Sequence, residues 1–426
     1  MVPTPLVSKN ADYDMKLKNS FFKYYLCTMF ILFSMASCYW YEEEQTYDRT
    51  VLIYMAADNN LSYTYGSTPS FAQEDLDEMI EAAGDIPTNS RLIIYIDDTD
   101  LPRILTIEQQ EGRRPTLKTL HQYTDEHNSG DAQTLRTVME WTTDNYPSQS
   151  YGLVIWSHGD AWIPAKAPAQ RAVCLDNQSS SWMEIADIAH ALEAFPQTEF
   201  ILFDACFMQS IEVAYELRHA THYIVASPAE IPAPGAPYKR IMKAMFANTN
   251  SATRIAEEYY NEYNEGKIPI NGQKEQTYGV CLSVVNCSQL EQLAAVTQEM
   301  ITKYVTLHNS GKPQGVQRYY LRNSSARPAY YDMNGYMQTL ITDIEDYSLW
   351  SSVFNSAIPH KRATPYWYSE YTGMEKLDTE NYGGISCYVP QSATTRTKLN
   401  EAFRSTSWYE ATGWEVWFPI TESSEQ

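Results

Sequence analysis

Short apolar runs alternate with helix-like runs through the first half of this chain, and this alternation restricts the folds that the chain can adopt. The strand-like runs cover residues 50–56, 91–96, 103–108, 153–157, 199–204 and 223–226. The runs with helical periodicity between them cover residues 73–83, 131–145, 182–194 and 211–220. Strands that are separated by helices pair in parallel, with helices on both faces of the sheet. We therefore predict an α/β fold built on a mostly parallel sheet.

The second half of the chain reads mainly as helices and loops that are rich in Tyr and Trp, such as 332–342 and 409–418. Packing explains these aromatic side chains better than a binding surface does, since Tyr and Trp pack well even when partly buried. Two later strand candidates, 279–285 and 384–389, are assigned to the same sheet. The chain is too long for one core of typical size. We expect a core at 49–245 and a C-terminal region, 246–426, that adds strands and a mainly helical subdomain.

Two of the predicted strands are followed by residues with acid/base or nucleophilic chemistry. His158 and Gly159 follow the strand at 153–157, and Cys206 follows the strand at 199–204. The carboxyl ends of parallel strands meet at one edge of a sheet, so His158 and Cys206 could share a cleft there. A cysteine nucleophile and its base need this arrangement. The alternative for each residue alone is structural, because a lone Cys in a strand is usually a small buried hydrophobe.

The residues around Cys206 favour a reactive thiol. A helix-like segment at 211–217 follows it closely, and we expect Cys206 to lie near the N-terminus of that helix. The positive end of a helix dipole lowers the pKa of a thiol and favours the thiolate.

Several motifs, taken in order, resemble those of the clostripain-like cysteine peptidases, which share the caspase-like fold with gingipains, legumains and caspases. The matching segments are 54–61, 75–79, 157–159, 204–208, 212–217 and 383–390. The resemblance implies a caspase-like sheet and a catalytic dyad without an obligatory third member. In that dyad His158 would be the general base and Cys206 the nucleophile. The backbone N–H groups of Gly159 and Cys206 are the candidate donors to the oxyanion.

Substrate preference is predicted from acidic residues close to the nucleophile. Asp204 lies two residues before Cys206, on the same face of the strand. The matching Asp of clostripain-like enzymes helps to recognise a basic P1 residue, so Asp204 is our candidate for the base of a Lys or Arg pocket. The alternative is a structural Asp that accepts nearby backbone N–H groups. Glu230 is a second candidate, in a segment that departs from the family pattern because Pro228 follows Ser227.

The loop after His158 contains two basic residues, Lys166 and Arg171. Members of this family can be made as zymogens that cut themselves after a basic residue in this region. Lys166 and Arg171 are therefore the candidate sites of self-cleavage.

The first 38 residues read as a targeting leader. A basic segment begins at Met15, the expected true start, and an apolar stretch too short for a membrane span ends just before Cys38. Small residues before a Cys resemble a bacterial lipoprotein processing site, with Cys38 as the lipidated residue. The alternatives are an ordinary cleaved signal peptide and a short membrane anchor. Residues 39–48 form an acidic tether, and we expect the protein in the cell envelope, lipid-anchored at the outer membrane or cell surface, or secreted.

Charge and cysteine usage limit the partners. The net charge of −22 argues against nucleic acid, whose phosphates would be repelled, and suits peptide substrates with basic residues. The cysteines are spread along the chain without metal-binding spacing, and we expect no disulfide framework.

A His/Cys dyad needs no cofactor. Some relatives use calcium, for which the acidic run 97–100 is a candidate, although such a run is more often a solvated loop. We expect a monomer.

Two other functions compete with hydrolysis. One is a catalytically inactive surface lipoprotein that binds peptides or glycans, which the presence of both His158 and Cys206 disfavours. The other is transpeptidation through the same dyad, which an acyl-enzyme permits if water is excluded.

Overall fold

The fold is known from a computed structural model of the 426-residue chain. It describes residues 46–64, 66, 68–163, 173–266, 268–270, 273–305, 313–319, 330–390 and 397–416. Cys38, Lys166 and Arg171 lie outside these ranges. The chain from Thr46 onward groups into a single unit. The boundaries predicted at residues 38, 48 and 245 stay predictions.

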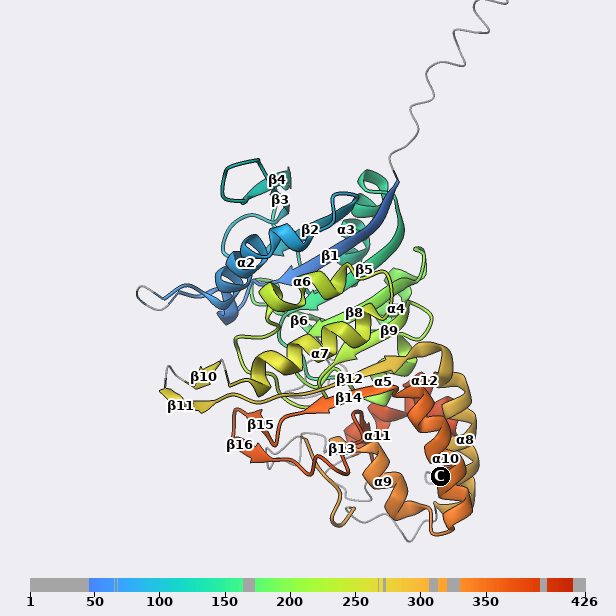
Figure 1. Cartoon of the computed structure of the whole chain (residues 1–426). Helices are drawn as coiled ribbons and strands as arrows, with labels where there is room; N and C mark the ends of the chain where they lie inside the picture. Colours follow the sequence, from blue (N-terminus) through green and yellow to red (C-terminus); the bar gives the residue numbers. More distant parts are fainter. Residues whose placement is uncertain are drawn as a thin grey trace, which may run out of the picture. The chain divides into compact units, whose positions relative to one another are not determined.

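A central sheet of nine strands in the described residues organises this unit, in the order β14-β12-β9-β8-β5-β1-β2-β3-β4 (Figure 1). Its middle consists of parallel strands: β1 (Tyr47–Ala56), β2 (Ser90–Asp97), β5 (Ser148–Trp156), β8 (Thr198–Asp204) and β9 (Thr221–Ala226). Antiparallel strands extend both sides: β3 (Arg103–Glu108), β4 (Thr116–Gln122), β12 (Cys281–Asn286) and β14 (His360–Ala363). The predicted α/β fold is confirmed.

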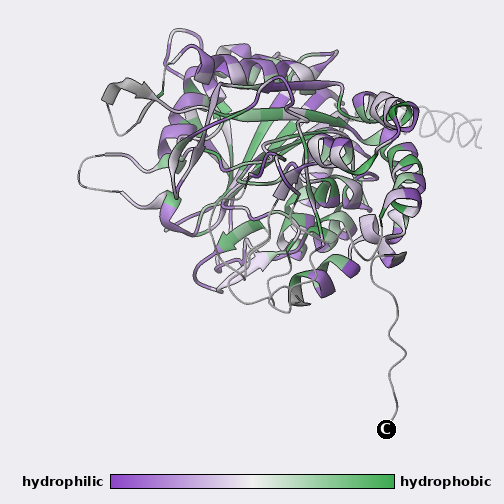
Figure 2. Cartoon of the chain, turned by 90° about the horizontal axis from the view of Figure 1, so that it is seen from below, coloured by the Kyte–Doolittle hydropathy of each residue, from purple (hydrophilic) through white to green (hydrophobic). Residues whose placement is uncertain are grey.

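Helices cover both faces of the sheet, and each face has its own apolar core. One face packs against α2 (Phe71–Glu81), α6 (Tyr238–Met245) and α7 (Ser251–Asn264). The other packs against α3 (Ala132–Asn145), α4 (Ile185–Leu192) and α5 (Ile211–Glu216). The central strands each contain a continuous apolar run because both of their faces are buried there, and Figure 2 shows these hydrophobic strands inside a more hydrophilic layer of helices.

Side-chain caps define where several of these helices begin. Ser70 caps α2, Asp131 caps α3 and Ser210 caps α5, each by accepting a hydrogen bond from a backbone N–H of the first turn. The α5 helix is shorter than the predicted 211–220, because it ends at Glu216. The α4 helix begins at Ile185, since the residues before it pair as β7 (Ser181–Met183) with β6 (Val173–Asp176).

The C-terminal region contributes helices beside the sheet and three further small strand pairs. The helices are α8 (Leu290–Tyr304), α9 (Met333–Leu340), α10 (Ile344–Ala357), α11 (Thr397–Arg404) and α12 (Ser407–Thr412). The pairs are β10 (Pro269–Ile270) with β11 (Gln273–Thr277), β13 (Tyr330–Asp332) with β17 (Ser386–Tyr388), and β15 (Tyr366–Ser369) with β16 (Gly373–Lys376). Short 3-10 helices lie at Asn60–Ser62 (η1), Ala83–Asp85 (η2), Cys287–Gln289 (η3) and Trp414–Val416 (η5). In the part of the chain that is described, no helix is long and apolar enough to cross a membrane.

The two late strand predictions have different outcomes. The segment 279–285 supplies β12 and joins the central sheet, as predicted. The prediction for 384–389 is wrong, because β17 pairs with β13 in a separate two-stranded sheet. The edge position beyond β12 is taken instead by β14, a short strand with the sequence His-Lys-Arg-Ala that has no apolar pattern.

Candidate active site

The carboxyl ends of β5 and β8 lie side by side, and the candidate catalytic residues follow them. The two strands pair in parallel with Trp156 opposite Asp204, so the chain leaves both strands at the same level. Gly159 then packs directly on the turn that carries Cys206. A Cβ atom on Gly159 would lie 2.8 Å from the carbonyl oxygen of Cys206 and 3.0 Å from the Cβ of Ala205. The segments that carry His158 and Cys206 therefore approach as closely as a glycine allows.

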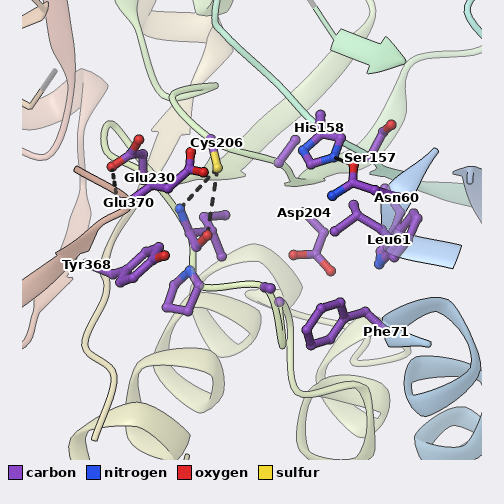
Figure 3. Close-up of a pocket in the computed structure, with 16 residues that line it drawn as sticks. Asn60, Leu61, Phe71, Ser157, His158, Asp204, Cys206, Glu230, Tyr368 and Glu370 are labelled. Carbon is purple, nitrogen blue, oxygen red and sulfur yellow. Dashed lines mark hydrogen bonds between the residues drawn. The ribbon is translucent and has the colours of Figure 1, made fainter. Parts of the chain in front are cut away.

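A cavity of about 230 Å³ opens at this edge of the sheet, and His158, Cys206, Asp204 and Glu230 all line it (Figure 3). Its walls come from four places in the chain: the segment from η1 to α2, the ends of β5 and β8, residues 230–235 after β9, and the β15–β16 hairpin. Trp156 forms part of the wall and is held by a hydrogen bond of 2.7 Å from its indole N–H to the buried carboxyl group of Asp75. The tertiary structure thus brings together all four residues expected at a substrate cleft.

The imidazole of His158 is partly buried beside the cavity and contacts Asn60. Its Nε2 lies 2.7 Å from Oδ1 of Asn60. The backbone beside it is fixed, because the carbonyl of His158 accepts the N–H of Cys174 and the hydroxyl of buried Ser157 donates to the carbonyl of Ala56.

Cys206 is partly buried, and its sulfur contacts the backbone of Ile231. The N–H of Ile231 donates to Sγ at 3.3 Å, and Sγ lies 3.7 Å from the carbonyl oxygen of the same residue. Burial raises the pKa of the Cys206 thiol to about 12; the Ile231 N–H opposes this rise, and the carboxylate of Glu230 adds to it. The thiol is therefore protonated at neutral pH in this state, and a base must remove its proton.

The prediction that a helix N-terminus lowers this pKa is wrong. Cys206 lies four positions before Ser210, the N-cap of α5, and the chain turns between them. Phe207 has a φ of 65°, in the left-handed region, and its N–H donates to the carbonyl of Ala229. The backbone N–H that contacts the sulfur comes from Ile231, not from the first turn of α5.

Asp204 lines the cavity and is also fully hydrogen-bonded within the protein. Its carboxylate accepts the N–H of Ala236 at 3.0 Å, the hydroxyl of Tyr238 at 3.1 Å and that of Tyr259 at 3.5 Å. Burial raises the pKa of Asp204 to about 6, although these hydrogen bonds oppose the rise. The carboxylate packs on Gly235, whose φ is +63° and where a Cβ would lie 2.9 Å from an Asp204 oxygen. The site thus holds a buried carboxylate that is mostly ionised at neutral pH.

Glu230 lies at another part of the cavity, close to Cys206 and the β15–β16 hairpin. Its carboxylate accepts the backbone N–H of Glu370 at 2.8 Å. Tyr368 and Glu370 of this segment line the cavity (Figure 3). Neither residue was predicted from the sequence, because both lie far along the chain in a segment without a recognisable motif. Asn60 lies within the matching segment 54–61, but no role was predicted for it.

The remaining site predictions concern the oxyanion donors and calcium. Gly159 forms a β-bridge with Val173, and its contact with Cys206 is described above. In the acidic run, Asp98 is held by two hydrogen bonds from the guanidinium of Arg103, and burial raises the pKa of Asp97 to about 7. Among the residues that the structure describes, no group of three or more His, Cys, Asp or Glu side chains is arranged to hold a metal ion. The five described cysteines are free.

Comparison with known proteins shows what kind of protein carries this site. The model of the clostripain family matches residues 53–418. This chain belongs to the clostripain family of cysteine peptidases. Clostripain of Hathewaya histolytica is 28% identical over 225 residues, which span 45% of this chain and 41% of clostripain.

Solved structures support the same assignment. A secreted C11 cysteine protease from Bacteroides thetaiotaomicron, in complex with an irreversible peptide inhibitor, is 30% identical with a TM-score of 0.74, and the match covers 86% of this chain and 99% of that one. An inactive zymogen C11 protease from Parabacteroides distasonis is 30% identical with a TM-score of 0.73, covering 86% and 98%. The family resemblance inferred from the sequence motifs is confirmed.

Proposed function

We propose that this protein is an endopeptidase that cleaves peptide bonds after Arg or Lys through His158 and Cys206. The observation that carries the proposal is the position of the Asp204 carboxylate, in the wall of the same cavity as the candidate nucleophile. Glu230 and Glu370 also line this cavity, and none of its lining residues is a Lys or Arg. A guanidinium or ammonium group of a substrate would meet these carboxylates there, and a charge-assisted hydrogen bond to a carboxylate is stronger than a neutral one.

The chemistry follows from the protonation state of the thiol. His158 takes the proton of Cys206, and the thiolate attacks the carbonyl carbon of the scissile bond. The negative charge that develops on the carbonyl oxygen requires nearby donors, for which the N–H groups of Gly159 and Cys206 stay our candidates. The imidazolium then protonates the leaving amine, and water, deprotonated by the imidazole, hydrolyses the acyl-enzyme. Burial raises the pKa of the Cys206 thiol to about 12. Substrate binding must therefore favour the pair of Cys206 thiolate and His158 imidazolium over the neutral thiol and imidazole.

We also propose that the enzyme is activated by self-cleavage after Lys166 or Arg171. Both residues lie outside the described ranges, between His158 and β6. An acidic cavity that accepts basic side chains would accept either of them, and one similar solved protein is an inactive zymogen. An enzyme with both residues changed to Ala should stay as a single band on a denaturing gel and have little activity. Full activity in that uncleaved variant would refute the proposal.

For the cellular location we propose the cell envelope, with Cys38 as the lipidated residue. A similar solved protein is described as secreted. Labelling of cells with a radioactive fatty acid should mark the wild-type protein and not Cys38→Ser. Label on neither protein would favour an ordinary secreted enzyme.

The test of the proposed activity is cleavage of fluorogenic peptides with Arg, Lys, Asp, Asn or Ala at P1, with the Cys206→Ala variant as the control. We expect turnover of the Arg and Lys substrates only, and none in the variant. Turnover after Asp or Asn would retain the catalytic pair and reject the role of Asp204. Absence of turnover, even after proteolytic activation and with calcium added, would favour a binding protein.

A further inference from the structure

Asn60 is the side chain of η1 that meets the imidazole of His158. The contact joins Asn60 Oδ1 to His158 Nε2 at 2.7 Å, a short distance for a hydrogen bond of this type (Figure 3). Asn60 lines the cavity together with His158. The two residues are far apart in the sequence, so this contact depends on the pairing of β1 with β5.

The preceding residue fixes the position of Asn60. Asn59 is fully buried and caps η1, with Oδ1 accepting the N–H of Leu61 at 3.0 Å. Its Nδ2 donates to the carbonyl of Ala56 at 2.9 Å and to that of Leu175 at 3.1 Å. The hydroxyl of Ser157, beside His158, donates to the same Ala56 carbonyl at 2.8 Å. The backbones that carry Asn60 and His158 are therefore tied to one point at the end of β1.

We infer that Asn60 is a positioning residue of the catalytic pair, a third member that orients His158 and selects its tautomer. This inference rests on the proposed function. An amide oxygen only accepts hydrogen bonds, so the nitrogen 2.7 Å from it must carry a proton. In the neutral ring Nδ1 then has the lone pair, and we assign to Nδ1 the removal of the proton of Cys206. A base oriented by a third group recurs on unrelated protease folds.

The proton balance of the reaction keeps this contact throughout. When Nδ1 takes the thiol proton, both ring nitrogens carry protons, and the Asn60 oxygen still accepts from Nε2. When Nδ1 protonates the leaving amine, the ring returns to the same tautomer. The ring therefore does not need to rotate or exchange tautomers between steps. Without Asn60, Nε2 would lose this acceptor, and the fraction of His158 in the orientation and tautomer competent for catalysis would fall.

The tautomer is measurable without any substrate. Spectra of the enzyme with ¹⁵N-labelled histidine, assigned by comparison with His158→Gln, report which ring nitrogen carries the proton. We expect the Nε2–H form of His158 in the wild type and a mixture of tautomers in Asn60→Ala. Asn89→Ala is the matched control, because Asn89 also makes a single side-chain hydrogen bond at the surface, to Asp48. An Nδ1–H form in the wild type, or an unchanged spectrum in Asn60→Ala, would overturn the inference.

Kinetics then test the consequence for catalysis. In Asn60→Ala we expect kcat to fall by roughly 10- to 100-fold with KM changed less than twofold, since a positioned base contributes about 10²- to 10⁴-fold. Alkylation of Cys206 by iodoacetamide should slow in parallel, and this readout does not depend on the proposed P1 preference. Asn60→Asp places a carboxylate beside the imidazole and stabilises its protonated form, so the acid limb of the pH profile should move upward. Unchanged kcat and alkylation rate in Asn60→Ala, or an unmoved limb in Asn60→Asp, would reject the positioning role even if cleavage after Arg is established.

Discussion

Replacement of Asp204 by Asn separates the two explanations of this buried carboxylate, charge recognition and structural support. The change removes one negative charge and keeps the size of the side chain. Its amide oxygen can still accept the N–H of Ala236, which the carboxylate accepts now at 3.0 Å. We therefore expect the variant to fold, with a small loss of stability from the weaker contacts with Tyr238 and Tyr259.

The expected loss of activity follows from the charge pair. Two unit charges 4 Å apart attract by about 4 kcal/mol at an effective dielectric constant of 20, and removal of one partner of a buried pair typically costs about 2–5 kcal/mol. A loss of about 3 kcal/mol corresponds to a decrease of roughly 100-fold in kcat/KM for substrates with Arg at P1. Citrulline has nearly the shape of Arg without its charge. Peptides with citrulline at P1 should be cleaved slowly and at nearly the same rate by both enzymes.

The pH dependence gives a second test of the same carboxylate. Burial raises the pKa of Asp204 to about 6, so its charge is lost as the pH falls through that value. In the wild type, kcat/KM for Arg substrates should therefore fall relative to that for citrulline substrates below about pH 6, and this difference should be absent in Asp204→Asn. Equal losses for Arg and citrulline substrates, with the pH-dependent difference unchanged, would refute the reasoning and leave Asp204 as a structural residue.

Three further predictions test how the site and its supports are built. Gly159→Ala should lower kcat by on the order of 100-fold, because its Cβ would lie 2.8 Å from the Cys206 carbonyl oxygen and a displacement of catalytic groups by about 1 Å can cost that much. Gly84→Ala is the control, since nothing lies within 4 Å of a Cβ there, and equal activity of the two variants would contradict the prediction. Glu212 is fully buried, and burial raises its pKa from 4.5 to about 7, so its ionisation lowers the free energy of unfolding as the pH rises from about 4.5 to 7. In denaturant titrations, the decrease over this range should be smaller for Glu212→Gln than for the wild type, by on the order of 2 kcal/mol. Identical pH profiles of the two proteins would contradict this prediction. Asp332→Ala should lower the free energy of unfolding by about 3 kcal/mol, because buried Asp332 caps α9 through the N–H of Gly335 and also accepts hydrogen bonds from the Tyr319 hydroxyl and the Gly383 N–H. A loss below about 1 kcal/mol in the same titrations would show that these groups find other partners.

Local patterns were sufficient to predict the central part of the fold. The strands β1, β2, β5, β8 and β9 each have a continuous apolar run, and such runs form strands that are buried on both faces. The short strand β14 could not be predicted in the same way. Its pairing with β12 depends on the antiparallel position that β12 leaves at the edge of the sheet, and on no pattern within its own four residues.

The sequence by itself determined that His158 and Cys206 follow two parallel strands, because each residue stands directly after an apolar run. Only the tertiary structure decided their surroundings. It placed Asn60 on His158, brought Ile231 instead of a helix N-terminus to Cys206, and set the β15–β16 hairpin beside Glu230. The physical reason is that strand identity depends on neighbouring residues along the chain. The pKa of a thiol or the tautomer of an imidazole depends on burial and hydrogen bonds, which distant segments supply once the chain has folded.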